Sequence, residues 1–246
     1  MKNWTSKIKF NSFYYLHIPK TGGRWLSSKL DNLLETFDYH KIKTVNDARK
    51  YDSEIGQERG SDDSEGYYEH TGWHPEINEK TFILATFRDP VKQLCSLWTN
   101  SNEEAIYASG INKELFLKDI KNESSYLNNQ SVSLSNSGKL KNFGMGLENL
   151  DLDFLIKKID RINQIILIQD KEIDFSKEMD LLLKTIEIDL EVKIDRWRNN
   201  TAAYKNKNPM SRSLFNSLSD EEKQYIAELQ NLDTALYNRI IEKNSK

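Results

Sequence analysis

Cysteine is nearly absent from this sequence. Cys95 is the single cysteine among 246 residues, so a disulfide cannot form within the chain, and this scarcity favours a reducing compartment. No stretch approaches the roughly 18 consecutive apolar residues that a membrane-spanning helix needs. A signal peptide has an apolar core followed by small residues, and the amino-terminal residues do not show this pattern. We therefore expect a soluble, cytoplasmic protein without a membrane partner.

A dominant charge of one sign is also missing. The chain has 35 lysine and arginine residues against 38 aspartate and glutamate residues, which gives a formal net charge of −3. Such a balance produces no global field that would attract nucleic acid or an anionic membrane. Any site for an anionic ligand must therefore be built locally, and we expect no nucleic-acid partner.

The chain length and the local composition indicate a single domain. At about 100–200 residues per domain, 246 residues predict one domain over 1–246. Polar, glycine-interrupted residues within 35–66 and serine- and asparagine-rich residues within 122–146 predict surface loops. We find no internal repeat and no linker to a second domain.

Short apolar runs alternate with amphipathic helical patterns along the chain. This alternation is typical of an α/β protein with a mainly parallel central sheet flanked by helices. A capping box at Ser219 predicts the start of the final helix. The strands are predicted at 13–18, 81–87 and 164–168, and the main helices at 25–34, 91–98, 113–120, 152–162, 175–186 and 220–240.

The segment FYYLHIPKTGGRWL at 13–26 is the first candidate site. A strand followed by a short glycine turn and a helix directs free backbone N–H groups at an anion. The paired glycines allow a phosphate to approach the backbone closely, and Lys20 adds a mobile positive charge. We therefore predict a phosphate-binding loop. Its residues are Lys20, Thr21, Gly22, Gly23, Arg24 and Trp25.

This loop is not a Walker A motif, because that motif has its lysine after the second glycine. In this chain Lys20 precedes both glycines. The alternative is a strand-to-helix turn with an exposed lysine and no ligand.

A second candidate site follows the apolar run at 81–87. Arg88 stands at the carboxyl end of this predicted strand, where open α/β sheets bind ligands. Asp89 is suited to cap a helix and Pro90 is suited to its first turn. Ser96 falls off the apolar face of that helix, about two turns in. The alternative is that Arg88 is simply paired with its neighbour Asp89.

The two motifs, P-K-T-G-G and R-D-P-V-x-x-x-x-S, resemble the signatures of the sulfotransferases that use 3′-phosphoadenosine-5′-phosphosulfate (PAPS). The resemblance is to the glycosaminoglycan and carbohydrate branch, which includes the uronyl 2-O-sulfotransferases. It implies a three-layer, P-loop-like α/β fold and the product 3′,5′-diphosphoadenosine. It implies that Lys20 stabilises the leaving phosphate and that Arg88 and Ser96 hold the 3′-phosphate. Arg24 departs from the family, which has threonine or serine there. It could contact a phosphate bidentately, point to solvent or bind an anionic acceptor.

The resemblance also suggests where the general base lies. Uronyl 2-O-sulfotransferases and their relatives place a catalytic histidine after a short strand between the two signatures. His70 and His74 lie in that interval, and His70 fits the arrangement better. Glu35 is a weaker candidate, and a histidine with only a structural role is the alternative for either position. The sequence contains no cysteine cluster and no H-E-x-x-H pattern, so no metal is predicted.

The last third of the chain holds a basic, polar stretch that begins at Arg198. In the sulfotransferases a similar loop closes the domain near the cofactor. By this resemblance Asn200 and Lys205 are candidates for cofactor binding, whereas a solvated basic surface is the alternative.

Three functional hypotheses follow from the sequence. The first is a sulfotransferase that moves the sulfuryl group of PAPS to a hydroxyl acceptor, for which a carbohydrate is the favoured class. The second is a nucleotide or small-molecule kinase with a modified phosphate loop. The third is a catalytically inactive module that binds a nucleotide. The sequence carries no signal for an oligomeric state.

Overall fold

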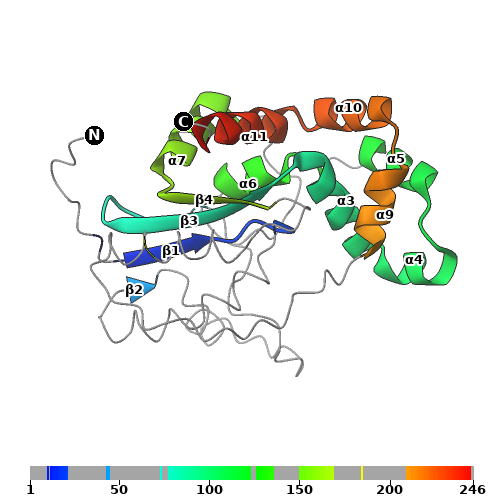
Figure 1. Cartoon of the computed structure of the whole chain (residues 1–246), viewed down its shortest axis with the longest axis horizontal. Coiled ribbons are helices and arrows are strands. Elements are labelled where there is room, and N and C mark those ends of the chain that lie inside the picture. The colour runs from blue at the N-terminus through cyan, green and yellow to red at the C-terminus, as the bar shows by residue number, and fades with distance from the viewer. Residues whose placement is uncertain are drawn as a thin grey trace, which may run out of the picture.

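The computed structural model of the chain is an α/β arrangement in which helices pack on a parallel sheet (Figure 1). It describes residues 10, 12–21, 43–44, 73, 77–122, 126–135, 150–168, 184 and 209–244.

The described strands form one sheet in which every neighbouring pair is parallel. The strand order is β2-β1-β3-β4, so the strands at the centre are β1 and β3. Tyr14 pairs with Ile83, and Leu84 pairs with Gln164. The strands are β1 (Ser12–Leu16), β2 (Lys43–Thr44), β3 (Thr81–Arg88) and β4 (Gln164–Ile168). The three predicted strands are confirmed, and the two-residue β2 is additional.

The described helices are predominantly short. They are α3 (Pro90–Ser101), α4 (Glu103–Ser109), α5 (Lys113–Asn122), α6 (Asn129–Ser135), α7 (Leu152–Arg161), α9 (Pro209–Ser217), α10 (Asp220–Leu229) and α11 (Asn231–Asn244). The predicted caps at Asp89 and Ser219 are confirmed. Asp89 accepts a hydrogen bond from the Lys92 amide at 3.0 Å, and Ser219 forms a capping box with Glu222. Asp151 caps α7 as well.

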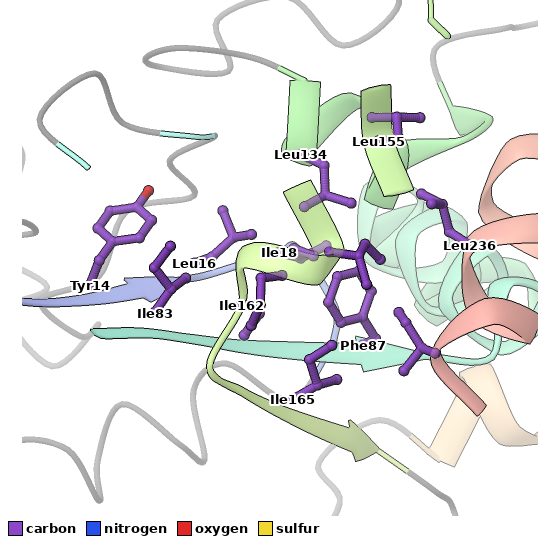
Figure 2. Packing of buried hydrophobic residues seen from close by; sticks show 13 residues of the cluster. Tyr14, Leu16, Ile18, Ile83, Phe87, Leu134, Leu155, Ile162, Ile165 and Leu236 are labelled. Carbon is purple, nitrogen blue, oxygen red and sulfur yellow. The ribbon is translucent and has the colours of Figure 1, made fainter. Parts of the chain in front are cut away.

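One face of the sheet packs against α6, α7 and α11 (Figure 2). Alternate residues of β1 and β3 supply the sheet side of this core, because side chains along a strand alternate between the two faces. Leu16, Ile83 and Ala85 are fully buried there. The helices contribute Leu134, Leu155, Ile159, Leu236 and Ile240. This core fixes the positions of β1 and β3, and so the direction in which the chain leaves each strand.

The opposite face of the central strands is buried as deeply. Tyr15, Phe82 and Leu84 have no exposed surface, and the rings of Phe13 and Phe82 stack with their centroids 6.0 Å apart. The central strands β1 and β3 are therefore covered on both faces, as expected for parallel strands with continuous apolar sequences.

A second apolar cluster lies beside the sheet, where α3 packs against α5, α9 and α10. The apolar face of α3 is buried in this cluster and consists of Val91, Leu94, Cys95 and Trp98. Figure 1 shows these helices grouped beyond the end of β3. The helix that follows Arg88 is thus held rigidly from its first turn.

The structure differs from the sequence prediction at 129–135. This segment lies within the predicted surface loop at 122–146, but it forms helix α6, and its first six residues are buried. Its serine and asparagine side chains are buried because they have hydrogen-bond partners inside the protein, as described below. Composition alone therefore gave the wrong prediction for this segment.

The prediction of a single helix after Ser219 is also wrong, because the helix is interrupted at Gln230. The apolar periodicity continues across this break. The break is stabilised from outside the helix, where the Asn128 side-chain oxygen accepts hydrogen bonds from the amides of Leu232 and Asp233, both at 3.1 Å. These bonds satisfy N–H groups that the first turn of a new helix leaves without an intrahelical partner.

The predicted helices at 25–34 and 175–186 lie outside the described residues, apart from the helical Lys184. The predicted loop at 35–66 also lies outside them, apart from β2. Within the described ranges, none of the helices combines the length and the apolar composition required to span a bilayer.

The pair Ile240 and Ile241 tests the core on α11. Ile240 has no exposed surface, whereas Ile241 is 40% exposed. We expect Ile240→Ala to lower the free energy of unfolding by about 2–5 kcal/mol, because truncation leaves a cavity between α11 and the sheet. Ile241→Ala should cost about 1 kcal/mol or less. Urea unfolding of both variants measures this difference, and equal losses would contradict the packing described.

Candidate functional site

The candidate site lies where the chain changes direction across the sheet. From β1 the chain continues to β2 on one side, and β3 then lies on the other side of β1. In open α/β sheets, ligands bind outside the carboxyl ends of the strands at such a topological switch point. The two sequence motifs follow β1 and β3, so both lie at this position.

Lys20 has an unusual backbone conformation in the loop after β1. Its φ is +59°, which lies in the left-handed region that residues with a side chain seldom adopt. Its ammonium group donates a hydrogen bond to the Asn100 side-chain oxygen on α3. The loop therefore directs the lysine side chain across the end of the sheet toward α3.

Thr21 anchors this loop in the protein interior. It is fully buried, and its hydroxyl donates to the Ile18 carbonyl at 2.8 Å. The same hydroxyl lies 2.8 Å from the hydroxyl of Thr86 on β3, which also lies 3.1 Å from the Tyr15 hydroxyl. Burial raises the pKa of the Tyr15 phenol, so this group keeps its proton. The row of hydroxyls therefore links the end of β1 to β3.

Arg88 brings the second motif next to the first. One terminal guanidinium nitrogen, Nη1, lies 3.5 Å from the Lys20 carbonyl oxygen and is oriented to donate to it. Asp89 accepts a hydrogen bond from the Lys92 amide as the cap of α3. Asp89 thus has the capping role predicted for it, and the guanidinium of Arg88 reaches the Lys20 loop. The sequence prediction did not require this contact.

Ser96 lies on the part of α3 that faces the same loop. It is 8% exposed. Asn100 follows it four residues later, so the two side chains share one face of the helix. Because Asn100 contacts Lys20, Ser96 belongs to the side of α3 that lies toward the site.

Buried amide side chains support the backbone of the site. The Gln93 amide nitrogen donates to the Pro19 carbonyl at 2.7 Å and lies 3.5 Å from the Asn129 side-chain oxygen. Gln130 accepts a hydrogen bond from the Arg88 amide at 3.1 Å and donates one to the Arg88 carbonyl at 2.9 Å. Asn129 and Gln130 are the first residues of α6, the helix that the sequence reading missed.

Asp233 holds the amino-terminal end of α6. Its carboxylate accepts hydrogen bonds from the Gln130 amide at 3.0 Å, the Ser131 amide at 2.7 Å and the Ser131 hydroxyl at 2.6 Å. The side chain has no exposed surface. Complete burial raises the pKa of the Asp233 carboxyl to about 6, although these hydrogen bonds act in the opposite direction.

The structure thus brings Lys20, Thr21 and Arg88 together, and Ser96 lies on the face of α3 that carries Asn100. The remaining candidates lie outside the described residues, and their roles stay predictions. They are Gly22, Gly23, Arg24, Trp25, His70, His74, Asn200 and Lys205. Trp73, between the two candidate histidines, is partly buried, and the Lys158 ammonium lies 5.0 Å from its ring centre.

Sequence reasoning missed Gln93, Asn100, Gln130 and Asp233. Asn100 could have been found, because it lies one helical turn beyond Ser96 on the same face. Gln130 and Asp233 carry no local signal, since the partner of each is distant in the chain: 42 residues separate Gln130 from Arg88, and 103 separate it from Asp233.

Comparison with known proteins finds no matching family model, no matching curated protein and no matching solved structure. The site therefore has to be interpreted from its own residues. Within the described ranges, no group of three or more histidine, cysteine, aspartate or glutamate side chains could hold a metal ion. The prediction that no metal takes part stays a prediction.

The titration of Asp233 provides a test of its burial. Its pKa rises from 3.8 to about 6 on folding, so the folded state prefers the protonated form. The resulting stabilisation is complete below pH 3.8 and is lost as the pH rises through 6, and it amounts to about 3 kcal/mol. We expect wild type to lose about this much stability relative to Asp233→Asn between acidic and neutral pH.

Denaturant unfolding at a series of pH values measures this difference. Ser133→Ala, which removes a buried hydroxyl of α6 and no ionisable group, is the control and should follow the wild-type pH profile. Parallel profiles for wild type and Asp233→Asn would contradict the burial of an ionisable carboxyl at this position.

Proposed function

We propose that this protein is a sulfotransferase that uses PAPS and sulfates a hydroxyl group, with a carbohydrate as the acceptor class. One observation carries the proposal: the Arg88 guanidinium lies 3.5 Å from the Lys20 carbonyl oxygen at the switch point of a parallel sheet. This contact unites two motifs that resemble the PAPS-binding signatures. A three-layer, P-loop-like architecture is part of the same proposal.

The residues present suit a ligand that carries two phosphates. Lys20 and Arg88 supply two positive charges at the ends of neighbouring strands, and Ser96 supplies a hydroxyl on the adjoining helix. Charge-assisted hydrogen bonds of this kind are stronger than neutral ones, and arginine binds phosphate in a bidentate manner. In the proposed assignment Arg88 and Ser96 bind the 3′-phosphate, and Lys20 binds near the 5′-phosphate.

When bound, PAPS supplies the sulfuryl group, which passes to the acceptor oxygen while 3′,5′-diphosphoadenosine leaves. Lys20 would stabilise the negative charge that grows on the leaving phosphate oxygen, the kind of electrostatic contribution worth roughly 10²–10³ in rate. A general base must take the proton of the acceptor hydroxyl. His70 and His74 are the proposed bases, with His70 preferred.

The kinase hypothesis and the inactive module remain alternatives. A kinase would need a magnesium-binding carboxylate beside the phosphate loop. Asp89, the acidic residue next to Arg88, caps α3 through the Lys92 amide instead. An inactive module would bind the nucleotide and transfer nothing, so it differs from the enzyme in turnover alone.

Calorimetric titration with 3′,5′-diphosphoadenosine tests the proposed binding site. We expect micromolar binding by wild type and binding at least about 10-fold weaker for Arg88→Ala, since a charge-assisted hydrogen bond contributes about 1.5–3 kcal/mol. Lys20→Ala should weaken binding in the same direction. The control is Lys121→Ala at the exposed end of α5, which should bind like wild type. Absence of binding by folded wild type would refute the sulfotransferase proposal.

A thermal-shift comparison separates the kinase from the sulfotransferase. A ligand that binds only the folded state raises the melting temperature. We expect stabilisation by 3′,5′-diphosphoadenosine that does not require magnesium, and little effect of ATP with or without Mg²⁺. Stabilisation by ATP that depends on Mg²⁺ would favour the kinase instead.

A further inference from the structure

We propose that Gln130 is a positioning residue for Arg88: it holds the end of β3 so that the guanidinium is presented to an anionic ligand, and Asp233 anchors it from α11. The contacts of Gln130 are independent of the ligand, whereas its effect on cofactor affinity rests on the function proposed above.

Gln130 occupies a place where a neighbouring strand would otherwise pair. The amide and carbonyl of Ile83 are both directed to Asn163, on the β4 side of β3. Since the backbone groups of successive strand residues alternate in direction, those of Arg88 point to the β1 side. There β1 has ended at Leu16, and the chain has turned into the Lys20 loop. The Gln130 side chain bonds both backbone groups of Arg88, at 3.1 and 2.9 Å, in place of a strand.

The backbone of Gln130 is itself held in place. Asp233 accepts hydrogen bonds from the Gln130 and Ser131 amides, and Asn128 accepts bonds from the amides at the start of α11. Asp233 of α11 therefore caps the amino-terminal end of α6, and Asn128, which directly precedes α6, caps the amino-terminal end of α11. Asn128 has a φ of +50°, which turns the chain into this arrangement. A shift of α6 along its axis would break bonds at both caps at once.

The same helix end also reaches the first motif. The Asn129 side-chain oxygen lies 3.5 Å from the Gln93 amide nitrogen, which donates to the Pro19 carbonyl at 2.7 Å. Consecutive residues of α6 thus support both sides of the candidate site, through Gln93 to the lysine loop and directly to Arg88. The side chains of Asn129 and Gln130 are uncharged, so they do not compete with an anionic ligand for Lys20 and Arg88.

Gln130→Ala tests the proposal because it removes the two bonds to Arg88 and leaves the arginine intact. The matched control is Ser133→Ala on the same helix. Ser133 is also fully buried, but its hydroxyl donates only within α6, to the Asn129 carbonyl at 2.9 Å. Both variants perturb α6, and only one of them releases the backbone of Arg88.

Hydrogen exchange of the Arg88 amide, followed by NMR, is the first measurement. We expect Gln130→Ala to raise its exchange rate about 5- to 10-fold above any change in the amides of β1, since one hydrogen bond is lost. The side-chain Nε–H signal of Arg88, assigned by its absence in Arg88→Lys, should shift in Gln130→Ala. Ser133→Ala should change neither readout.

Affinity for 3′,5′-diphosphoadenosine is the second measurement, and we expect Gln130→Ala to weaken it about 5- to 10-fold, less than Arg88→Ala does. An unchanged Arg88 amide and Nε–H signal would overturn the positioning role, and so would equal acceleration of exchange throughout the core. Unchanged affinity in Gln130→Ala, where Arg88→Ala loses binding, would overturn it as well. If wild type binds no nucleotide, the proposed function is wrong, and the two NMR readouts alone decide the role of Gln130.

Discussion

The arrangement of the candidate site depends on one buried carboxylate. Asp233 has no exposed surface, and an ionised group in such an environment is stable only when hydrogen bonds replace its hydration. Donors from Gln130 and Ser131 at the start of α6 replace part of this hydration, while burial still raises the pKa of the carboxyl to about 6. The demand for compensation therefore fixes α6 against α11, and α6 in turn fixes the end of β3. The burial of Asp233 thus determines, through α6 and Gln130, the position of Arg88 at the end of β3.

The parts of the fold that the sequence predicted are those in which the cause is local. The apolar runs at 13–18, 81–87 and 164–168 became strands because parallel strands buried on both faces need continuous apolar sequence. The caps at Asp89 and Ser219 were predicted because a capping side chain lies within a few residues of the amides it binds. The position of Arg88 at a strand end followed from the same local pattern.

The parts that the sequence did not predict have causes that are distant in the chain. Residues 129–135 have the composition of a loop, and they form a buried helix because Asp233, more than 100 residues later, binds its first amides. The break at Gln230 is invisible to periodicity because Asn128 stabilises it from another segment. Polar residues that are buried with partners and polar residues that are solvated look alike in composition. They differ only in whether the folded chain or water supplies their hydrogen-bond partners.

The use of neutral amides around the site follows from the charge of the chain. With 35 basic and 38 acidic residues, the protein has no general positive field, so the anionic ligand proposed above would be attracted by the few cations at the strand ends. A carboxylate placed beside Arg88 would position the arginine but would also neutralise it. An amide such as Gln130 can donate and accept at once, so it holds both backbone groups of Arg88 without altering the charge. The acidic anchor, Asp233, lies on α11 and acts through the backbone of α6. This separation allows the scaffold to be rigid while the positive charges stay available to a ligand.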